Sequence, residues 1–353
     1  MLEFNEPIEL MGVPGSPYTR KMLALLRYRR LQYRLLPASR HKLNPDNERY
    51  PQRPEPKVQL LPTFYLVDKS GEGQAVCDTT PIIRQLEQMR SARSVIPKNP
   101  ILALINYIIE DYGDEWLTKA MFHYRWSYKA DIQKAGELLP RWSNISEDSA
   151  ALSERIQAIR ELQISRLRYV GSNEVTKDSI ENSFKRFIDK LDKHLNKMGF
   201  ILGKRPSSCD FAIYGQLTCL ALFDPTPQKH ILDNAPRVYA WVEIMEDLSG
   251  YECLPGDWLS PWRLPDTLME LLTEIGSIYA PYLIANSNAY AKGLKEFESD
   301  IAGSRWKQAT FPYQVRCLQG IREKYSKLDP EQVEEADEIF SGTGISALFK
   351  QNN

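Results

Sequence analysis

The chain has few cysteines and histidines, and neither residue type is clustered. The five cysteines are an odd number and include no C-x-x-C pair. They are spread over the chain as Cys77, Cys209, Cys219, Cys253 and Cys317. This pattern argues against a disulfide framework and a cysteine zinc site, and the four histidines lie too far apart in sequence to complete one. We therefore expect no bound metal and a location in the reducing cytoplasm.

The sequence also lacks an excess of one charge and a long apolar run. Its 45 basic and 46 acidic residues give a formal net charge of −1, and no run of lysine and arginine is present. We therefore expect neither nucleic acid nor a membrane as a partner. The most apolar stretch, residues 211–223, is too short to cross a bilayer and is interrupted by Gly215, Gln216 and Thr218. The acidic residues 1–6 lack the basic and apolar regions of a signal peptide.

What is present is a composition typical of globular proteins. The 353 residues are 42% hydrophobic and 26% charged, which is enough to bury the core of two domains. In the first ninety residues, Ile8–Met11 indicates a strand, residues 12–17 are rich in turn formers, and an amphipathic helix begins at Tyr18 with Lys21 on its polar side. Further strands are predicted at 33–36, 62–67 and 74–77, with a loop at 39–58 and a hairpin turn at 68–73.

The predicted order of elements is β-α-β, loop, β-β-α, and residues 78–81 open the last helix of this set. From Ile101 onward the periodicity is almost only helical, and residues 91–99 are predicted to form a linker. The pattern therefore predicts an α/β domain followed by an all-α domain.

Three local features of the first domain carry polar groups that suit a charged peptide ligand. Ser16 lies at a strand-to-helix turn, where unpaired backbone N–H groups favour an anion. Leu61-Pro62 opens a strand, and a cis proline there would leave the preceding backbone able to pair with an extended peptide. Asp78 and Thr79 lie at another helix start, where backbone amides can take a carboxylate and the Asp78 carboxylate can take an ammonium group.

In these features the first domain resembles the N-terminal domain of cytosolic glutathione transferases. Ser16-Pro17-Tyr18 matches the catalytic serine of tau-like members and the position that is cysteine in omega members. Leu61-Pro62 matches the family's cis-proline step, and Asp78-Thr79 stands where the family usually has Glu-Ser or Gln-Ser against the γ-glutamyl group. The resemblance implies a thioredoxin-like fold and glutathione as co-substrate, bound by Ser16, Leu61, Pro62, Asp78 and Thr79.

The second half of the chain agrees with this resemblance. Residues 200–211 are similar to the family's helix-capping signature, in which Ser207 caps a buried helix and Asp210 supports the turn. The resemblance covers about residues 7–250. The predicted parts are a thioredoxin-like glutathione-binding domain at 1–90, an all-helical domain at 99–250, and a helical extension packed on the body at 251–353.

This extension follows the point where most relatives end. Helical patterning is predicted at 266–279, 286–298 and 313–327. Its large apolar side chains, which need burial, include Trp258, Trp262, Tyr279, Tyr282 and Trp306. We hypothesise that the extension covers the second-substrate pocket; the alternative is that it packs elsewhere or extends an interface.

The chemistry that the resemblance implies is thiol activation. A free thiol has a pKa of about 8.5, so only about 3% is thiolate at pH 7. A hydrogen bond from Ser16 to the sulfur anion contributes roughly 1.5–3 kcal/mol, which lowers the thiol pKa by about 1–2 units. Ser16 is therefore the predicted catalytic residue, as a donor to the thiolate rather than as a nucleophile. The alternative is that Ser16 and Asp78-Thr79 are only helix caps.

The position of the corresponding helix in relatives suggests residues for a second-substrate pocket. Tyr18 is one candidate, and the candidates on this helix are Tyr107, Asp111, Tyr112 and Trp116. An aromatic stripe at helical spacing more often belongs to a core, and we expect core for at least half of them.

The function that follows is that of a cytoplasmic, homodimeric glutathione transferase acting in detoxification. It would add the glutathione thiolate to a small hydrophobic electrophile, or use it in reductive or ether-cleaving chemistry. The alternative is a non-catalytic protein of the same fold that binds a ligand or partner. Glutaredoxin-like thiol exchange is disfavoured because Ser16 replaces the needed cysteine and Thr19 the resolving one.

Overall fold

The computed structural model describes residues 6–37, 53–67, 71–142, 145–146, 148–254 and 256–350. Its N-terminal part is a four-stranded sheet in the order β2-β1-β3-β4, in which β1 is parallel to β2 and antiparallel to β3. The strands are β1 (Ile8–Gly12), β2 (Tyr33–Pro37), β3 (Thr63–Val67) and β4 (Gly73–Val76). With α1 (Pro17–Tyr28) and α3 (Thr79–Met89), this sheet confirms the thioredoxin-like fold. Residues 39–52 of the predicted loop and 68–70 of the predicted turn lie outside the described residues.

The two helices of this part are amphipathic and bury their apolar sides. In α1 the buried residues include Met22, Leu25 and Leu26, and in α3 they include Ile82 and Ile83. These side chains belong to one core cluster that extends into the helices beyond the sheet.

The region after the sheet is helical, as predicted. Its elements are α4 (Pro100–Glu115), α5 (Leu117–Ser127), α6 (Lys129–Arg141), α7 (Ser149–Ser165), η1 (Leu167–Val170), α8 (Lys177–Leu195), α9 (Ser208–Leu217), the π-helical η2 (Thr218–Phe223), α10 (Pro225–Asn234) and α11 (Pro236–Met245). Helix α9 is buried along its length and packs against both α1 and α4. Its start is fixed by the predicted capping residues, because the Asp210 carboxylate accepts hydrogen bonds from the Ser207 N–H at 2.9 Å and the Ser207 hydroxyl at 2.5 Å.

The C-terminal extension contains helices and one hairpin. Its elements are η3 (Pro261–Arg263), α12 (Asp266–Ala291), β5 (Glu296–Ile301), β6 (Ser304–Ala309), α13 (Pro312–Tyr325), α14 (Pro330–Phe340) and η4 (Ile345–Leu348). The prediction of a helix over 286–298 is therefore wrong for the second half of that range. Gly293, with φ 68°, follows the end of α12, and Phe297 and Ile301 of β5 alternate with exposed residues as a strand requires.

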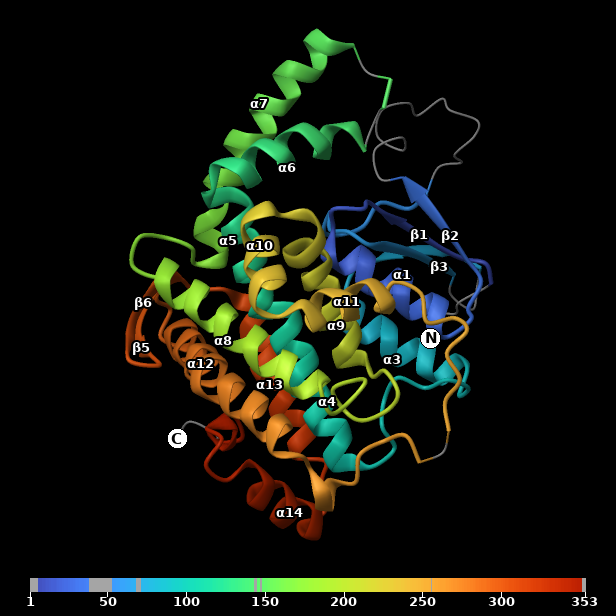
Figure 1. The fold of residues 1–353 in the computed structure, drawn as a ribbon, viewed down its shortest axis with the longest axis vertical. Helices are drawn as coiled ribbons and strands as arrows, with labels where there is room; N and C mark the ends of the chain where they lie inside the picture. The colour runs from blue at the N-terminus through green and yellow to red at the C-terminus, as the bar shows by residue number, and fades with distance from the viewer. Residues whose placement is uncertain are drawn as a thin grey trace.

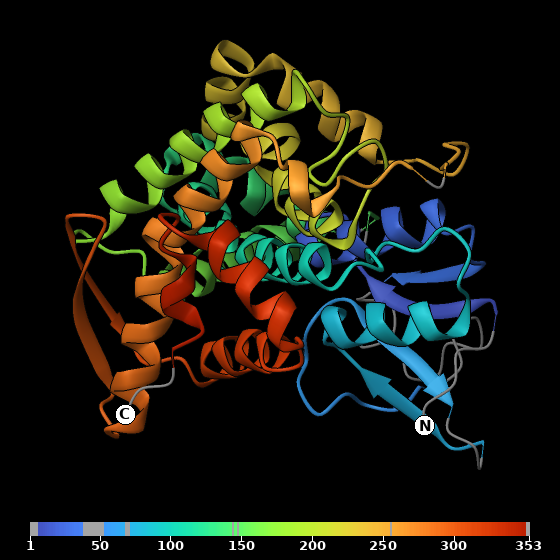
Figure 2. The same cartoon turned by 90° about the horizontal axis from the view of Figure 1, so that it is seen from below.

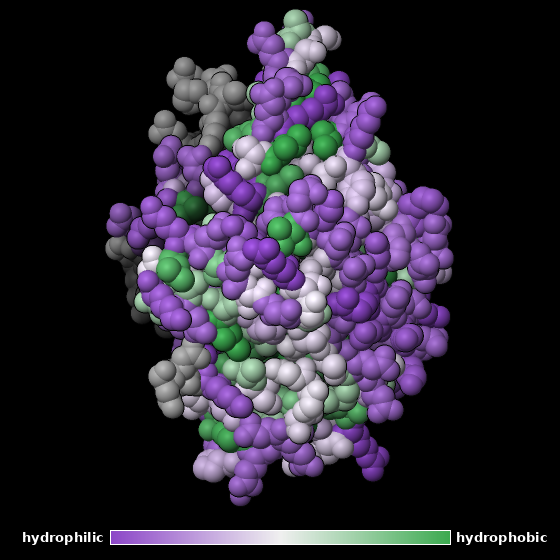
Figure 3. Space-filling model, turned by 90° about the vertical axis from the view of Figure 1, so that its left-hand side faces the viewer, coloured by the Kyte–Doolittle hydropathy of each residue, from purple (hydrophilic) through white to green (hydrophobic). Residues whose placement is uncertain are grey.

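The extension lies against the body of the protein. Figure 1 shows the sheet on one side of the molecule, the helices on the other, and α6 and α7 projecting from one end. Figure 2 shows the orange and red elements α12 to α14 beside α4 and reaching toward the blue N-terminal elements. On the face in Figure 3, hydrophobic residues lie in small patches between hydrophilic ones. No helix among the described residues is long and apolar enough to cross a membrane.

Candidate active site

The first part of the site joins the start of α1 to the segment before β3. Ser16 is the N-cap of α1: its hydroxyl oxygen accepts from the Thr19 N–H at 3.2 Å. The same hydroxyl donates to the Leu61 carbonyl at 3.2 Å. The Leu61–Pro62 peptide bond is cis, as the resemblance implied. The structure thus brings Ser16 into contact with the backbone that immediately precedes Pro62.

The second part is the start of α3. Asp78 is the N-cap of this helix, and its Oδ1 accepts from the Thr80 N–H at 3.3 Å. Thr79, the first residue of α3, is buried, and its hydroxyl accepts from the Lys21 ammonium at 3.3 Å. Because Lys21 belongs to α1, this contact connects the Asp78-Thr79 turn to the helix that Ser16 begins.

A buried ionic cluster lies behind these two helix starts. The Lys21 ammonium, fully buried, donates to Asp114 at 2.6 Å and to Glu110 at 3.3 Å. Glu110 also accepts from Arg84 at 3.1 Å and from the Ser208 hydroxyl at 2.5 Å. The cluster therefore ties α1, α3, α4 and α9 together at the point where the sheet meets the helices.

The charges in this cluster are set by how many partners each carboxylate has. Burial opposes the ionisation of Glu110, but Lys21 and Arg84 outweigh it and lower the pKa of Glu110 to about 2. Burial raises the pKa of Asp114 to about 6, although Lys21 opposes that shift. Burial alone would lower the pKa of Lys21, but Asp114 and Glu110 together raise it above its usual value. This ammonium is therefore charged at neutral pH. A fixed positive charge therefore lies directly beneath Thr79.

Sequence reasoning missed Lys21, because it placed this residue on the polar side of the helix. The signal was available: Lys21 is four residues after Pro17 and four before Leu25, so it lies on the buried side of α1. The carboxylates of α4 that pair with it gave no local signal.

The candidates for the second-substrate pocket contact other parts of the protein, where an open pocket was expected. The Tyr18 hydroxyl donates to the Asp114 carbonyl at 2.6 Å. Tyr112 and Trp116 are buried, and the rings of Tyr279 and Trp306 from the extension pack on them at 5.8 and 5.2 Å between centroids. These two residues are core, which is half of the four candidates on α4, as expected.

The other two candidates on α4 also face the extension. The Asp111 carboxylate accepts from the Tyr279 hydroxyl at 2.6 Å, and burial raises the pKa of Asp111 to about 7. The Tyr107 hydroxyl lies so close to Gly320 of α13 that a Cβ there would be 2.4 Å away. Residues expected to line a pocket are thus covered by α12 and α13.

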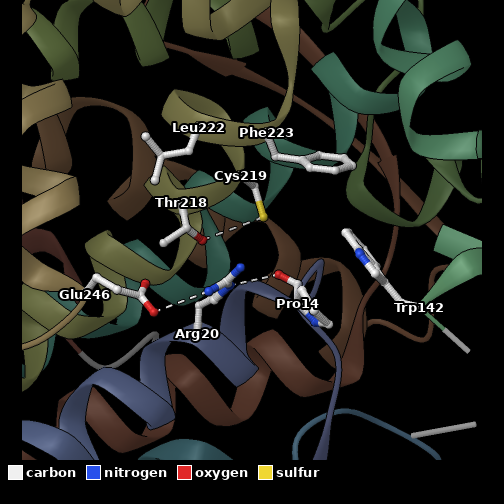
Figure 4. A pocket seen from close by; sticks show the side chains of 8 residues that line it. All are labelled: Pro14, Arg20, Trp142, Thr218, Cys219, Leu222, Phe223 and Glu246. Atoms are coloured by element: carbon white, nitrogen blue, oxygen red, sulfur yellow. Dashed lines mark hydrogen bonds and ion pairs between the residues drawn. The ribbon is translucent and has the colours of Figure 1, made fainter. Parts of the chain in front are cut away.

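A cavity of about 130 Å³ lies beside the loop before α1, where Pro14 lines it (Figure 4). The rings of Trp142 and Phe223 and the side chain of Pro14 border it. At its other end Arg20 donates to Glu246 at 3.3 Å. Gly15, next to Ser16, lies against Trp142, because a Cβ on it would be 2.1 Å from the indole ring. The cavity is smaller than the roughly 300–1,000 Å³ of sites for drug-sized ligands, so it suits a small apolar group.

The extension also reaches the start of α3. The Tyr313 hydroxyl donates to Asp78 Oδ2 at 3.0 Å, across 235 residues of sequence. No pattern in the sequence pointed to this pair, since nothing local links a helix in the extension to a turn in the first domain.

Comparisons with known proteins place these features in one family. The family model of the glutathione S-transferase N-terminal domain matches residues 10–94, and that of the C-terminal domain matches residues 163–250. Residues beyond 250 are not covered by either match. No curated protein is similar enough to the chain to match it.

Solved structures with a similar arrangement share little sequence with the chain. Beta-etherase LigF from Sphingobium sp. strain SYK-6 is 16% identical, with 67% of this chain and 94% of that chain covered and a TM-score of 0.44. A glutathione transferase family member from Pseudomonas fluorescens pf-5, with two glutathione bound, is 15% identical, with coverages of 68% and 92% and a TM-score of 0.39. The tau class glutathione S-transferase from mango, Mangifera indica, is 16% identical, with coverages of 67% and 87% and a TM-score of 0.37.

Proposed function

The chain belongs to the glutathione S-transferase family, and from that premise we propose that it binds glutathione and activates its thiol for attack on a small electrophile. One observation carries the proposal. The Ser16 hydroxyl lies at the N-terminus of α1 and points at the carbonyl of Leu61, the residue before cis-Pro62. A peptide thiol paired with the Leu61 backbone would therefore place its sulfur beside this hydroxyl.

The Ser16 hydroxyl would turn from the Leu61 carbonyl to the bound sulfur. Its present bond is 3.2 Å long, beyond the usual range of about 2.5–3.0 Å for an O–H···O bond, so a charged acceptor competes well for the proton. A hydrogen bond to a charged group is worth roughly 1.5–3 kcal/mol, and a helix N-terminus adds about 0.3–1 kcal/mol. Together they would lower the thiol pKa by roughly 1–3 units and ionise most of the bound thiol at pH 7.

The rest of the peptide would extend toward α3. Its γ-glutamyl carboxylate would bind the first backbone amides of α3 around Thr79, above the charged Lys21, and its ammonium would bind Asp78. The electrophile would enter from the side of Pro14, Trp142 and Phe223, because the extension covers the α4 residues first considered for that role.

A non-catalytic role as a binding protein of this fold is the second candidate. The covering of Tyr107, Asp111, Tyr112 and Trp116 by the extension favours it, because it removes the surface on which a second substrate was expected. A homodimer, a cytoplasmic location and a detoxifying role also stay proposals. The family dimer would use the last helix of the first domain and the first helices of the second, and here α12, α13 and α14 contact α4.

The experiment that separates the candidates compares Ser16→Ala with the wild type. Both should bind glutathione in calorimetry, but ultraviolet absorbance of the bound thiolate should show a thiol pKa about 1–2 units higher in the variant. Turnover with a model electrophile should fall by roughly the corresponding 10–100-fold. Ser165→Ala is the matched control, because its hydroxyl also donates to a backbone carbonyl, that of Leu162, on the exposed α7. Equal thiol pKa and turnover in both proteins would reject the catalytic role of Ser16.

A further inference from the structure

The contact between Tyr313 and Asp78 joins the extension to the proposed glutathione site. Tyr313 is the second residue of α13, and its hydroxyl donates to Asp78 Oδ2 at 3.0 Å. The other carboxylate oxygen, Oδ1, caps α3 through the Thr80 N–H. Asp78 is therefore held from two sides, by its own helix and by a helix that begins 234 residues later.

The first turn of α13 is firmly positioned, so this contact is not a chance approach of a loose end. The buried Asn286 of α12 accepts from the Phe311 N–H at 2.8 Å and donates to the Phe311 carbonyl at 3.0 Å. On the other side, the buried Gln314 donates to Glu115 at 3.0 Å and accepts from the Tyr282 hydroxyl. These bonds flank Tyr313 on both sides in the sequence and fix where its side chain begins.

The pair still has acceptors to offer. A carboxylate has about four lone-pair positions, of which the hydrogen bonds from Tyr313 and Thr80 use two. The phenol O–H of Tyr313 donates its only proton to Asp78, so the lone pairs of the oxygen are left as acceptors for another donor. Burial and the nearby Asp78 raise the pKa of Tyr313 well above its usual value, so the phenol stays protonated at physiological pH. Two acceptors, one of them charged, thus lie within 3.0 Å of each other.

This arrangement matches the chemistry of a primary ammonium group, which has three N–H donors and one positive charge. Tyr313 is 39% exposed and its hydrogen bond to Asp78 lies at the exposed surface, so a ligand can reach this pair.

We propose that Tyr313 is a specificity-determining residue for glutathione, and that its hydroxyl and the Asp78 carboxylate together bind the γ-glutamyl ammonium group. This inference rests on the proposed function, because it needs glutathione at the site. It gives the extension a role in recognising the first substrate. The opposite effect, a Tyr313 that occupies the ammonium position and blocks it, is an outcome that the test distinguishes.

The test uses the full chain and calorimetry with two ligands. One is glutathione, and the other is its analogue without the α-amino group, glutaryl-cysteinyl-glycine. Tyr313→Phe should weaken the binding of glutathione about 5–10-fold, the effect of one lost hydrogen bond, and leave the binding of the analogue unchanged. In turnover, KM for glutathione should rise and kcat should stay the same.

The matched control is Tyr325→Phe, which removes another tyrosine–aspartate hydrogen bond of α13, that to Asp337 at 2.7 Å, far from the site in sequence. It should change neither affinity. A second arm uses Asp78→Asn, in which the additional effect of Tyr313→Phe should largely disappear, because the two groups act on one ammonium.

The possible failures are distinct. If the wild type binds glutathione but Tyr313→Phe weakens both ligands equally or neither, the ammonium role is wrong and the proposed function stands. If Tyr313→Phe binds glutathione more tightly, Tyr313 blocks the site and the inference is overturned. If the wild type itself does not bind glutathione, the proposed function and this inference fail together.

Discussion

The hydroxyl of Ser16 donates to the carbonyl of Leu61 at 3.2 Å. The candidate catalytic residue is therefore in direct contact with the backbone that is proposed to bind the peptide. Ser16 is at once the N-cap of α1, through the Thr19 N–H, and a donor across the site. The cap and the catalytic interpretations of this serine are therefore compatible, because the oxygen accepts in one role and the proton is donated in the other.

This geometry predicts the effect of placing a thiol at position 16. In Ser16→Cys, the helix N-terminus should lower the thiol pKa, and the thiolate should attack oxidised glutathione to form one mixed disulfide and release one reduced glutathione. Because Thr19 cannot act as a resolving thiol, the mixed disulfide should accumulate and be visible by mass spectrometry. The control Ser165→Cys should react far more slowly at equal pH. Similar rates for both variants would contradict the proposed position of the sulfur.

The buried cluster predicts a large loss of stability when its cation is removed. Lys21→Met leaves Asp114 without its ammonium partner and takes one of two cationic partners from Glu110, which should cost about 3–5 kcal/mol in the free energy of unfolding by urea. Arg20→Met, at the adjacent position, removes a partly exposed ion pair with Glu246 and an exposed hydrogen bond to the Pro14 carbonyl, and should cost less than about 1 kcal/mol. Equal small losses would show that Lys21 contributes no more than a surface charge.

A second consequence concerns pH. Burial is the main cause that raises the pKa of Glu115 from 4.5 to about 8, and the charge of Asp111 is the second. The folded protein therefore binds this proton more tightly than the unfolded chain, and the stabilisation, complete below pH 4.5, is lost as the pH rises to about 8. Glu115→Gln keeps an acceptor for Gln314 but cannot ionise, so the unfolding midpoint should depend less on pH between 5 and 8.

The control for this measurement is Glu161→Gln. Glu161 also accepts from a glutamine, Gln157 at 2.7 Å, but on the exposed surface of α7. Its variant should keep the pH dependence of the wild type. The two variants should differ in the free energy of unfolding at pH 8 by on the order of 1 kcal/mol. Because Glu115 is partly exposed, solvent screening makes this difference smaller than the pKa shift alone would give. Parallel pH profiles would show that Glu115 ionises normally in the folded state.

The cavity beside the Ser16 loop predicts that enlarging Gly15 impairs activity and that shrinking Trp142 restores it. Gly15→Ala would bring a methyl group to 2.1 Å from the Trp142 ring, so either the loop or the indole must move. A shift of the loop by about 1 Å should lower kcat/KM by up to roughly 100-fold. Gly15→Ala with Trp142→Ala should recover most of the loss, because the added methyl then has room. Gly199→Ala, where a Cβ meets nothing within 4 Å, is the neutral control. No recovery in the double variant would show that the cavity does not adjoin the reacting centre.

Features that depend on neighbours in sequence were predictable. The order of strands and helices up to α3 follows from local turn chemistry and periodicity, and the cap at Ser207 and the cis bond before Pro62 were implied by the family resemblance. The ionic cluster around Lys21 was not, because its carboxylates are on a helix about ninety residues away and no local pattern reports them. The hairpin β5–β6 was missed as well. Its turn uses Ala302 and Gly303 at positive φ, and alanine is not a residue that signals such a turn.

The sequence hypothesis for the extension was that it covers the second-substrate pocket, and deletion of residues 260–353 was the natural test. The structure predicts another result for that deletion. Tyr279, Tyr282 and Trp306 of the extension are buried against Trp116, and Leu271, Leu272 and Ile275 lie in the same core as α4 and α8. Each such side chain contributes roughly 1.5–3 kcal/mol by burial, so the joint loss of these six is as large as the usual stability of about 5–15 kcal/mol.

Residues 1–259 alone should therefore fail to give a cooperative thermal transition and should aggregate. Co-expression with a separate fragment of residues 260–353 should restore solubility, because the buried surfaces of Tyr112 and Trp116 are then covered again without a covalent link. A soluble 1–259 fragment that melts cooperatively would contradict this, and it would mean that the helical part before the extension closes its own core. Because the deletion removes the core along with any effect on substrates, the role of the extension in recognition has to be measured by single substitutions in the full chain.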